Sequence, residues 1–374
     1  EKEMDIYMRI LGLDKIKTRS VLIGGGTPTF LTPAQLKRFL DGFVKRHDIS
    51  RCKQFNYDVD PATLIGPDGL ERLKIMRDYG VDRLTIGVQS LNEEILHLMN
   101  RTHDAKQAIE SIENSWKFGY KVNIEYIFGH PGQTIDLWIE EMEDAIATGV
   151  TEIQLYRLKV EAYGDYQGPI KKYKRIRPDN VPTAEDAIRM KQLSISMLNR
   201  AGYHETLRRV FSKDHRIFSV YAHNQCCSLF DEIGYGLTSF SSMRDRFGLN
   251  TQYFEEYYSM IEKGRLPLTR GLVRGTEEQM RWAIILPLKN RDVRKPYFKK
   301  VTGGQSLDHV FRGKIETMKQ FGLVEEDDMV LRLTTLGKFF ADECMQQFES
   351  VKYIPYPQSE YADGPLNPYR DGQP

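Results

Sequence analysis

The chain has 374 residues, of which 40% are hydrophobic and 28% are charged. This composition is typical of a globular protein, and the length suffices for one large α/β domain and a smaller one. The formal net charge of +1 gives no electrostatic reason to expect binding to nucleic acid or to an acidic membrane surface. No apolar stretch approaches the roughly 18 residues that span a bilayer, so the sequence predicts no membrane span.

The cysteines and histidines indicate neither a disulfide framework nor a metal site. Cys52, Cys226, Cys227 and Cys344 are scattered along the chain, which favours reduced thiols in a cytoplasmic protein. Adjacent cysteines suit one metal ion poorly, so we interpret the pair at 226 and 227 as small buried hydrophobic residues. The histidines at 103, 130 and 223 are likewise interpreted as structural.

Apolar residues at helical spacing predict an amphipathic helix from the first residues to Leu11. Because the chain opens inside this helix, we expect that the natural protein continues upstream. Strand and helix patterns then alternate as far as residue 158, which predicts an α/β fold of parallel βα units. The predicted strands are Ser20–Ile23, Gln54–Val59, Arg83–Val88, Lys121–Phe128 and Glu152–Leu158, and the helices begin near Pro33, include residues 70–76 and cover residues 137–147.

The remainder of the chain is more irregular. Residues 164–182 are rich in Gly, Pro, Lys and Tyr, which is typical of an active-site flap or a linker. A helix is predicted from Ala184 to Ala201, and residues 230–242 indicate a further strand with a glycine-containing loop. After residue 275 the pattern predicts helices over residues 279–288 and 307–321, followed by the strand pair and last helix of a winged-helix module. The neutral charge argues against DNA binding by that module.

The most informative segment is the apolar strand that precedes Gly24–Gly26 and Thr27–Thr29. The three glycines remove every side chain from the end of the strand, so that a ligand can approach the backbone closely. Ligands of α/β proteins bind at the carboxyl ends of the strands. The segment therefore predicts a cofactor site lined by backbone, with a phosphate site in an ordinary barrel enzyme as one alternative.

Polar residues also occur where each of the later predicted strands ends. Barrel enzymes build their active sites from such positions, although polar strand ends also serve solvation. Five successive strands that end in this way favour a functional edge. The polar residues at these later strand ends are Asp58 and Asp60, Gln89 and Ser90, Asn123 and Glu125, and Gln154, Tyr156 and Arg157.

The order and spacing of six motifs resemble those of a known enzyme family. The motifs are GGGTPT (24–29), DVDP (58–61), GVQS (87–90), NRTH (100–103), GHPGQT (129–134) and GYGLTSF (234–240). Together they resemble the radical S-adenosylmethionine (SAM) enzymes of the oxygen-independent coproporphyrinogen III oxidase-like (HemN-like) family, over residues 20–345. This resemblance implies a partial (β/α)6-type barrel in residues 20–275, a small winged-helix-like helical domain in residues 276–345 and a Pro- and Tyr-rich tail in residues 346–374.

The resemblance also implies a SAM site. The glycines would bind the amino group of the SAM methionine, Asp58 would hold the ribose or amino group, and Arg101 would pair with the carboxylate. Asp58 stands where the family usually has Glu, and Glu125 stands where it has Asp. The residues that the resemblance assigns to SAM are Gly24, Gly25, Gly26, Thr27, Asp58, Gln89, Arg101, Glu125, Gly234 and Gly236.

The family holds a [4Fe–4S] cluster through three cysteines in a CxxxCxxC pattern, which this sequence does not contain. We therefore expect the cluster cysteines N-terminal to residue 1, with residues 1–19 forming the helix that leads out of the cluster loop. The implied chemistry is the anaerobic cleavage of SAM to a 5′-deoxyadenosyl radical, with electrons from a reductant such as flavodoxin or ferredoxin.

Membership of such a family leaves the reaction open. We expect a small planar cyclic substrate, which undergoes tetrapyrrole oxidation, decarboxylation or ring opening, or else aromatic C-methylation by a methyltransferase. Candidate substrate contacts are Tyr156, Arg157, Arg208 and Arg209. The alternative is a non-catalytic haem-binding chaperone of the same family.

Overall fold

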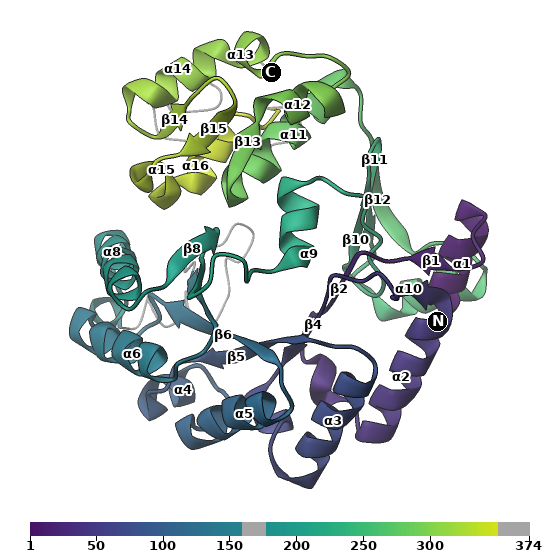
Figure 1. Ribbon diagram of the computed structural model, residues 1–374, viewed down its shortest axis with the longest axis vertical. Coiled ribbons are helices and arrows are strands. Elements are labelled where there is room, and N and C mark those ends of the chain that lie inside the picture. The colour runs from purple at the N-terminus through teal and green to yellow at the C-terminus, as the bar shows by residue number, and fades with distance from the viewer. Residues whose placement is uncertain (159–176, 351–374) are drawn as a thin grey trace. The chain divides into compact units, whose positions relative to one another are not determined.

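The computed structural model describes residues 1–158 and 177–350 (Figure 1). Most of the tail predicted at residues 346–374 and most of the flap or linker predicted at residues 164–182 lie outside the described residues. The chain divides into two compact units. One unit, called the barrel unit below, is Lys15–Tyr221, and the other combines Glu1–Asp14 with the chain from Ala222 onward.

The barrel unit is built on a curled seven-stranded sheet with the order β2-β4-β5-β6-β7-β9-β8. The first five strands are parallel, and β9 and β8 are antiparallel. The strands are β2 (Ser20–Ile23), β4 (Gln54–Val59), β5 (Arg83–Gln89), β6 (Lys121–Phe128), β7 (Glu152–Arg157), β8 (His204–Leu207) and β9 (Val210–Ser212), beside a separate short pair of β1 (Ile16–Lys17) and β3 (His47–Asp48). The predicted α/β fold and its five parallel strands are confirmed.

Alternation along the strands separates an apolar outer face from a polar inner face. Phe55, Leu84 and Ile124 are buried on the outer face, along which α3, α5 and α6 run (Figure 1). Trp138 in α6 is fully buried there and donates from Nε1 to Ser194 Oγ of α8 at 2.8 Å. The helices of this unit are α2 (Pro33–Arg46), α3 (Gly66–Asp78), α4 (Glu93–Leu98), α5 (Ala105–Lys117), α6 (Ile135–Ala147) and α8 (Ala184–Arg200), with short turns η1 (Pro28–Phe30), η2 (Pro61–Thr63) and η3 (Pro178–Asn180).

The continuation of the sheet after β7 differs from the prediction. The next strands are the antiparallel hairpin β8–β9, which the sequence did not reveal because its tight turn contains Arg208 and Arg209 rather than a turn-forming dipeptide. Arg209 adopts a left-handed φ of 71° there. Of the strand predicted in residues 230–242, only Phe240–Met243 forms a regular strand, β10, and it belongs to a different sheet.

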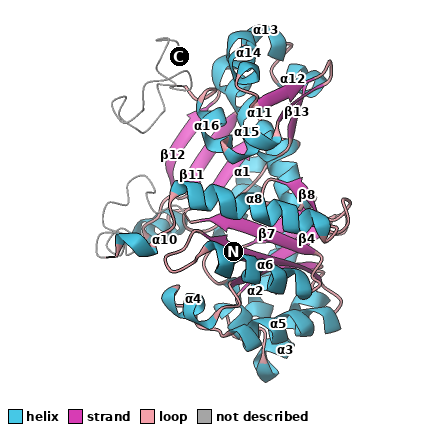
Figure 2. Ribbon diagram, turned by 90° about the vertical axis from the view of Figure 1, so that its left-hand side faces the viewer, coloured by secondary structure: helices cyan, strands magenta, loops and turns pink. Residues whose placement is uncertain are grey.

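The second unit contains an antiparallel sheet of β10, β11 (Arg246–Asn250) and β12 (Leu268–Val273), of which β11 and β12 lie side by side in Figure 2. Helices α1 (Lys2–Leu11) and α10 (Phe254–Glu262) pack together in this unit. The Glu3 carboxylate of α1 is 3% exposed and accepts hydrogen bonds from Asn250 Nδ2 at 2.7 Å, Tyr257 OH at 2.6 Å and Gly236 N at 2.8 Å. These three contacts fix α1 in place.

The last part of this unit has its own core, in which Phe298, Phe311, Met318 and Phe348 are buried. The predicted helix over residues 307–321 is broken at Phe311 into α13 and α14. A small antiparallel sheet of order β13-β15-β14 completes the predicted strand pair. The elements are α9 (Val220–Ala222), η4 (His223–Cys227), α11 (Thr276–Asn290), β13 (Asp292–Arg294), α12 (Lys295–Val301), α13 (Leu307–Val310), α14 (Arg312–Gln320), β14 (Val324–Glu326), β15 (Val330–Leu333), α15 (Thr335–Phe339) and α16 (Ala341–Gln346). Among the described helices, none is both long and apolar enough to cross a membrane.

Candidate functional site

The glycines that follow β2 form an open backbone surface beside Asp58. Gly24, Gly25, Gly26 and Thr27 are all exposed. A β carbon added to Gly24 would lie 2.3 Å from Asp58 Oδ2, a separation at which one of the two must move. Gly25 and Gly26 have φ values of 83° and 61°, which favour glycine over any other residue. The strand therefore ends in a glycine cradle, meaning the exposed backbone of Gly24–Gly26, which lies directly against the Asp58 carboxyl group.

Two carboxyl groups point into this edge of the barrel from β4 and β6. Burial raises the pKa of Asp58 to about 6, against the lowering effect of hydrogen bonds and of nearby Arg83. Burial and the charge of Asp58 together raise the pKa of Glu125 to about 7. A bound cation would favour the ionised form of both groups, so the pair is suited to bind an ammonium group.

Gln89 and Arg101 add polar groups that lack partners within the described part of the chain. Gln89 ends β5 with a left-handed φ of 68°, and its buried Oε1 has no hydrogen-bond partner there. Arg101 Nη2 donates to Asp60 Oδ2 at 3.1 Å and to Gly87 O at 2.9 Å, while its buried Nε has no such partner. A guanidinium with an unused donor can bind a carboxylate.

A buried carboxyl group on α6 braces the two loops of the GVQS and GHPGQT motifs. Glu141 is 1% exposed and accepts hydrogen bonds from Ser90 Oγ and, at 2.9 Å, from Gln133 Nε2. Gln133 in turn accepts from His130 N at 2.9 Å. Burial raises the pKa of Glu141 to about 7. The brace helps to hold Gln89 in its strained backbone conformation, because Ser90 follows it directly.

The four candidate substrate residues lie at the ends of β7 and of the β8–β9 hairpin. The Tyr156 hydroxyl accepts a hydrogen bond from Gln154 Nε2 and interacts with Glu125. The Arg209 guanidinium lies 5.8 Å from the centre of the Tyr156 ring. Arg209 O also accepts from the backbone N–H of Leu155 at 2.9 Å, which ties the hairpin turn with Arg208 to β7. Arg157 is exposed at the last position of β7.

Gly234 and Gly236 lie in the other unit, and the structure gives each a partner within that unit. Gly234 N donates to Ser241 Oγ at 3.0 Å, and Gly236 N donates to Glu3. A β carbon on Gly234 would lie 2.2 Å from Phe240 O. Close packing therefore explains Gly234, and the assignment of both glycines to SAM stays a prediction.

The described residues offer no metal site. They contain no group of three or more His, Cys, Asp or Glu side chains that could hold a metal ion. Burial raises the pKa of the Cys226 and Cys227 thiols to about 12, so neither is a ready thiolate. Burial likewise lowers the pKa of His103, whose Nε2 lies 3.0 Å from Val88 O. The described residues thus fit SAM but do not supply the thiolates of an iron–sulfur cluster.

Comparison with known proteins shows which proteins this chain is similar to. The model of the Radical SAM superfamily matches residues 2–145. The chain is 26% identical to the haem chaperone HemW of Bacillus subtilis over 355 residues, which cover 93% of this chain and 89% of that protein. It is 25% identical to the oxygen-independent coproporphyrinogen III oxidase of Pseudomonas aeruginosa over 77% of this chain and 63% of that protein, or less than two thirds of its length.

The fold agrees with these similarities. The solved structure of coproporphyrinogen III oxidase (HemN) from Escherichia coli superposes with a TM-score of 0.78 at 20% identity, and the match covers 93% of this chain and 82% of that one. In fold and sequence the chain is similar to radical SAM proteins, a class for which SAM and a [4Fe–4S] cluster are implied. Within that class the similarity is to HemN-like proteins, the coproporphyrinogen oxidases and haem chaperone named above.

Sequence reasoning missed the buried groups behind the site. Glu141 could have been found, because it occupies a core position of α6 between the buried Trp138 and Met142. A carboxylate at an apolar helix position requires a polar partner. The inner-face contacts of Arg83 carried no such signal, because they join strands that are far apart in the sequence.

Proposed function

We propose that the barrel unit binds SAM across the ends of β2, β4, β5 and β6. The exposed backbone of Gly24–Gly26 approaches the methionine moiety, Asp58 and Glu125 accept from its ammonium group, and Arg101 binds its carboxylate. One observation carries this assignment: Gly24 lies so close to the buried Asp58 carboxyl group that a β carbon there would be 2.3 Å from Asp58 Oδ2, and the buried Glu125 carboxyl group interacts with Asp58. Arg101 Nε and Gln89 Oε1, which have no partner among the described residues, support it.

We further propose that the protein is an enzyme that acts on a planar tetrapyrrole-like substrate. SAM bound at a reduced cluster supplies a 5′-deoxyadenosyl radical in this superfamily, and the residues of this chain would bind and orient SAM and exclude water. The relatives named as coproporphyrinogen oxidase and haem chaperone support a tetrapyrrole. The reaction is oxidation, decarboxylation or ring opening of the tetrapyrrole, with C-methylation of an aromatic ring as the alternative. An electron supply from flavodoxin or ferredoxin and a cytoplasmic location are also part of the proposal.

A substrate with carboxylate groups would suit the edge formed by Tyr156 and the β8–β9 hairpin. Arg157, Arg208 and Arg209 bring positive charge to this edge, and guanidinium groups bind carboxylates through paired hydrogen bonds. The second candidate function is haem binding without turnover. The similarity to a haem chaperone over 93% of the chain favours it.

The two functions are separated by one pair of assays on the full chain. The protein is incubated anaerobically with iron, sulfide and a reductant, and 5′-deoxyadenosine is measured after SAM is added. Haem is titrated in parallel and its Soret band is followed. Formation of 5′-deoxyadenosine supports the enzyme, whereas stoichiometric haem binding without SAM cleavage supports the chaperone. A protein that neither cleaves SAM nor binds haem contradicts both.

A further inference from the structure

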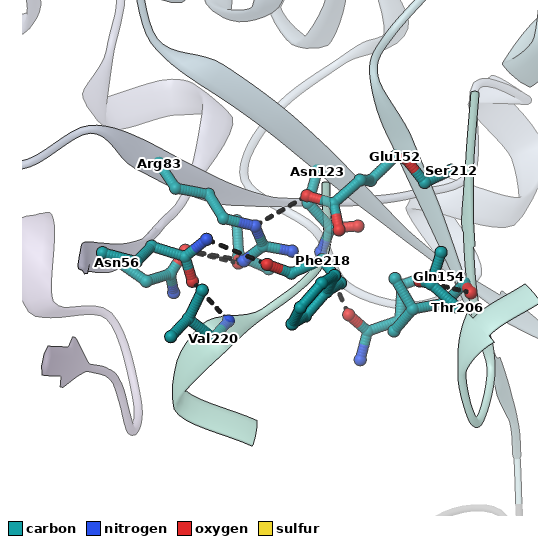
Figure 3. Close-up of polar contacts among 12 residues, drawn as sticks. Asn56, Arg83, Asn123, Glu152, Gln154, Thr206, Ser212, Phe218 and Val220 are labelled. Carbon is teal, nitrogen blue, oxygen red and sulfur yellow. Dashed lines mark hydrogen bonds and ion pairs between the residues drawn. The ribbon is translucent and has the colours of Figure 1, made fainter. Parts of the chain in front are cut away.

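A buried ion pair lies on the inner face of the barrel sheet (Figure 3). Arg83 at the start of β5 is 2% exposed, and Glu152 at the start of β7 is fully buried. Arg83 Nε donates to Glu152 Oε2 at 2.7 Å. A pair of this kind contributes little net stability, because removing both charges from water is costly. Its consequences for neighbouring groups are therefore more informative than its own energy.

The ion pair fixes the orientation of the Asn56 carboxamide in β4. Arg83 Nη1 donates to Asn56 Oδ1 at 2.7 Å, and Thr85 Oγ1 donates to the same oxygen at 3.2 Å. A guanidinium has only donors, so the carboxamide must turn its oxygen toward Arg83. Its nitrogen then faces the other way, and Asn56 Nδ2 donates to Asp58 Oδ1 at 3.0 Å.

The groups around Asp58 decide how readily it ionises. Burial raises its pKa, and the largest opposing contribution is the hydrogen bond from Asn56, ahead of the charge of Arg83 and the hydroxyl of Thr85. Glu125 from β6 and Tyr156 from β7 also face Asp58, because its charge raises the pKa of both. Gly24, which directly follows β2, also lies against the Asp58 carboxyl group. The donor from Asn56 is thus the main contact that keeps Asp58 charged.

We propose that the Glu152–Arg83 pair positions Asp58 for SAM. By holding the NH2 group of Asn56 toward Asp58, it keeps this carboxyl group an ionised acceptor for the ammonium group of the ligand. The inference rests on the proposed function only in naming SAM as the ligand of Asp58. Arg83, Glu152 and Asn56 are positioning residues, since the contacts that define their role are with each other and with Asp58.

The test is a pH titration of the Asp58 carboxyl group in the full chain by infrared spectroscopy. The band of Asp58 is assigned by its absence from Asp58→Asn. Asn56→Leu removes the three hydrogen bonds of the carboxamide and keeps the branched shape of the side chain, and we expect the midpoint to rise by at least about one pH unit. Asn114→Leu is the matched control: Asn114 is a buried asparagine of α5 that donates to Leu64 O at 3.2 Å. The midpoint in this control should equal that of the wild type.

A second variant distinguishes the positioning of Asn56 by Arg83 from the effect of the positive charge of Arg83 on Asp58. Arg83→Lys retains the positive charge but loses the planar fork that binds Glu152 and Asn56 together, so the midpoint should still rise. The SAM dissociation constant of each variant is measured in parallel. It should increase about tenfold below the raised midpoint of Asp58 and return to the wild-type value above it, since one pH unit corresponds to a tenfold change in the ionised fraction.

Each outcome decides the proposal. A folded Asn56→Leu protein with the wild-type midpoint overturns it, and so does an unchanged midpoint in Arg83→Lys, because charge alone would then suffice. If the Leu variant does not fold, Asn56→Ala adds no bulk and must show the same rise. If the wild type binds no SAM, the proposed function fails, but the infrared midpoints still confirm or overturn the positioning of Asp58.

Discussion

Gly24 and Asp58 lie so close together that there is no room for a methyl group on Gly24 unless the Asp58 carboxyl group moves. A β carbon on Gly24 would lie 2.3 Å from Asp58 Oδ2, well inside van der Waals contact. Gly24 follows β2 and Asp58 lies in the neighbouring parallel strand β4, and helix α2 separates the two motifs in the sequence. This contact joins the glycine motif to the carboxylate, and it is the most direct structural reason to place a ligand there.

The first prediction concerns this contact. Gly24→Ala should displace the Asp58 carboxylate and weaken SAM binding by about tenfold or more, the loss expected for one charge-assisted hydrogen bond. Isothermal titration calorimetry with SAM measures the effect. Gly313→Ala is the control, since a β carbon there meets no atom within 4 Å. Equal SAM affinity in both variants would contradict the cradle.

Arg101 should discriminate between SAM and its decarboxylated analogue. Its guanidinium has a buried, unpartnered Nε within the described residues, so Arg101→Gln should lose about 2 kcal/mol of SAM binding but little of the binding to decarboxylated SAM. Competition binding with both ligands provides the measurement. As a control, Arg72→Gln removes an arginine of the same unit that donates to Leu31 O at 2.8 Å. If Arg101→Gln weakens both ligands equally, the guanidinium does not bind the carboxylate.

The buried carboxyl group of Glu141 should make the free energy of unfolding depend on pH. Its pKa is raised by burial from 4.5 to about 7 in the folded chain, so the folded state binds the proton more tightly than the unfolded state does. The contribution of protonated Glu141 to the free energy of unfolding is fully present below about pH 4.5. It is lost as the pH rises through about 7, which lowers the free energy of unfolding by about 3 kcal/mol. Urea unfolding at several pH values should therefore show a flatter profile for Glu141→Gln than for the wild type.

The control for this measurement is Glu143→Gln on the same helix. Glu143 is exposed, so its removal should leave the pH profile of the unfolding free energy unchanged. Parallel profiles for the wild type and Glu141→Gln would show that burial does not raise the pKa of Glu141, because its carboxyl group would then ionise equally readily in the folded and unfolded chains.

The hydrogen bonds of Glu3 should stabilise the second unit. Its buried carboxylate accepts three hydrogen bonds, from Asn250, Tyr257 and Gly236. Glu3→Ala leaves these donors unsatisfied and should lower the free energy of unfolding by about 3 kcal/mol. Denaturant unfolding measures the loss. Glu255→Ala, at an exposed position of α10, should change the stability by less than about 0.5 kcal/mol; a similar cost for both substitutions would mean that Glu3 does not hold α1.

The sequence predicted the five parallel strands because each is a short apolar run between turn residues, and their order follows from the βα pattern. It predicted the edge residues Asp58, Gln89 and Glu125 because parallel strands end at a common edge. It could not show the Asn56–Arg83–Glu152 contacts, which depend on three-dimensional register between β4, β5 and β7. It also missed the β8–β9 hairpin, whose turn has Arg209 in a conformation that glycine or asparagine usually adopts.

The most direct test of SAM binding at Asp58 is the SAM dissociation constant of the full chain and of Asp58→Asn, measured by equilibrium dialysis above pH 7. Asp58→Asn nearly preserves the size of the side chain but removes the charge that faces the ammonium group. We predict saturable binding by the wild type and affinity at least about tenfold weaker for the variant, because hydrogen bonds to charged groups are worth about 1.5–3 kcal/mol. Equal affinity in the two proteins, or no binding by the wild type, would contradict a SAM site at this carboxylate.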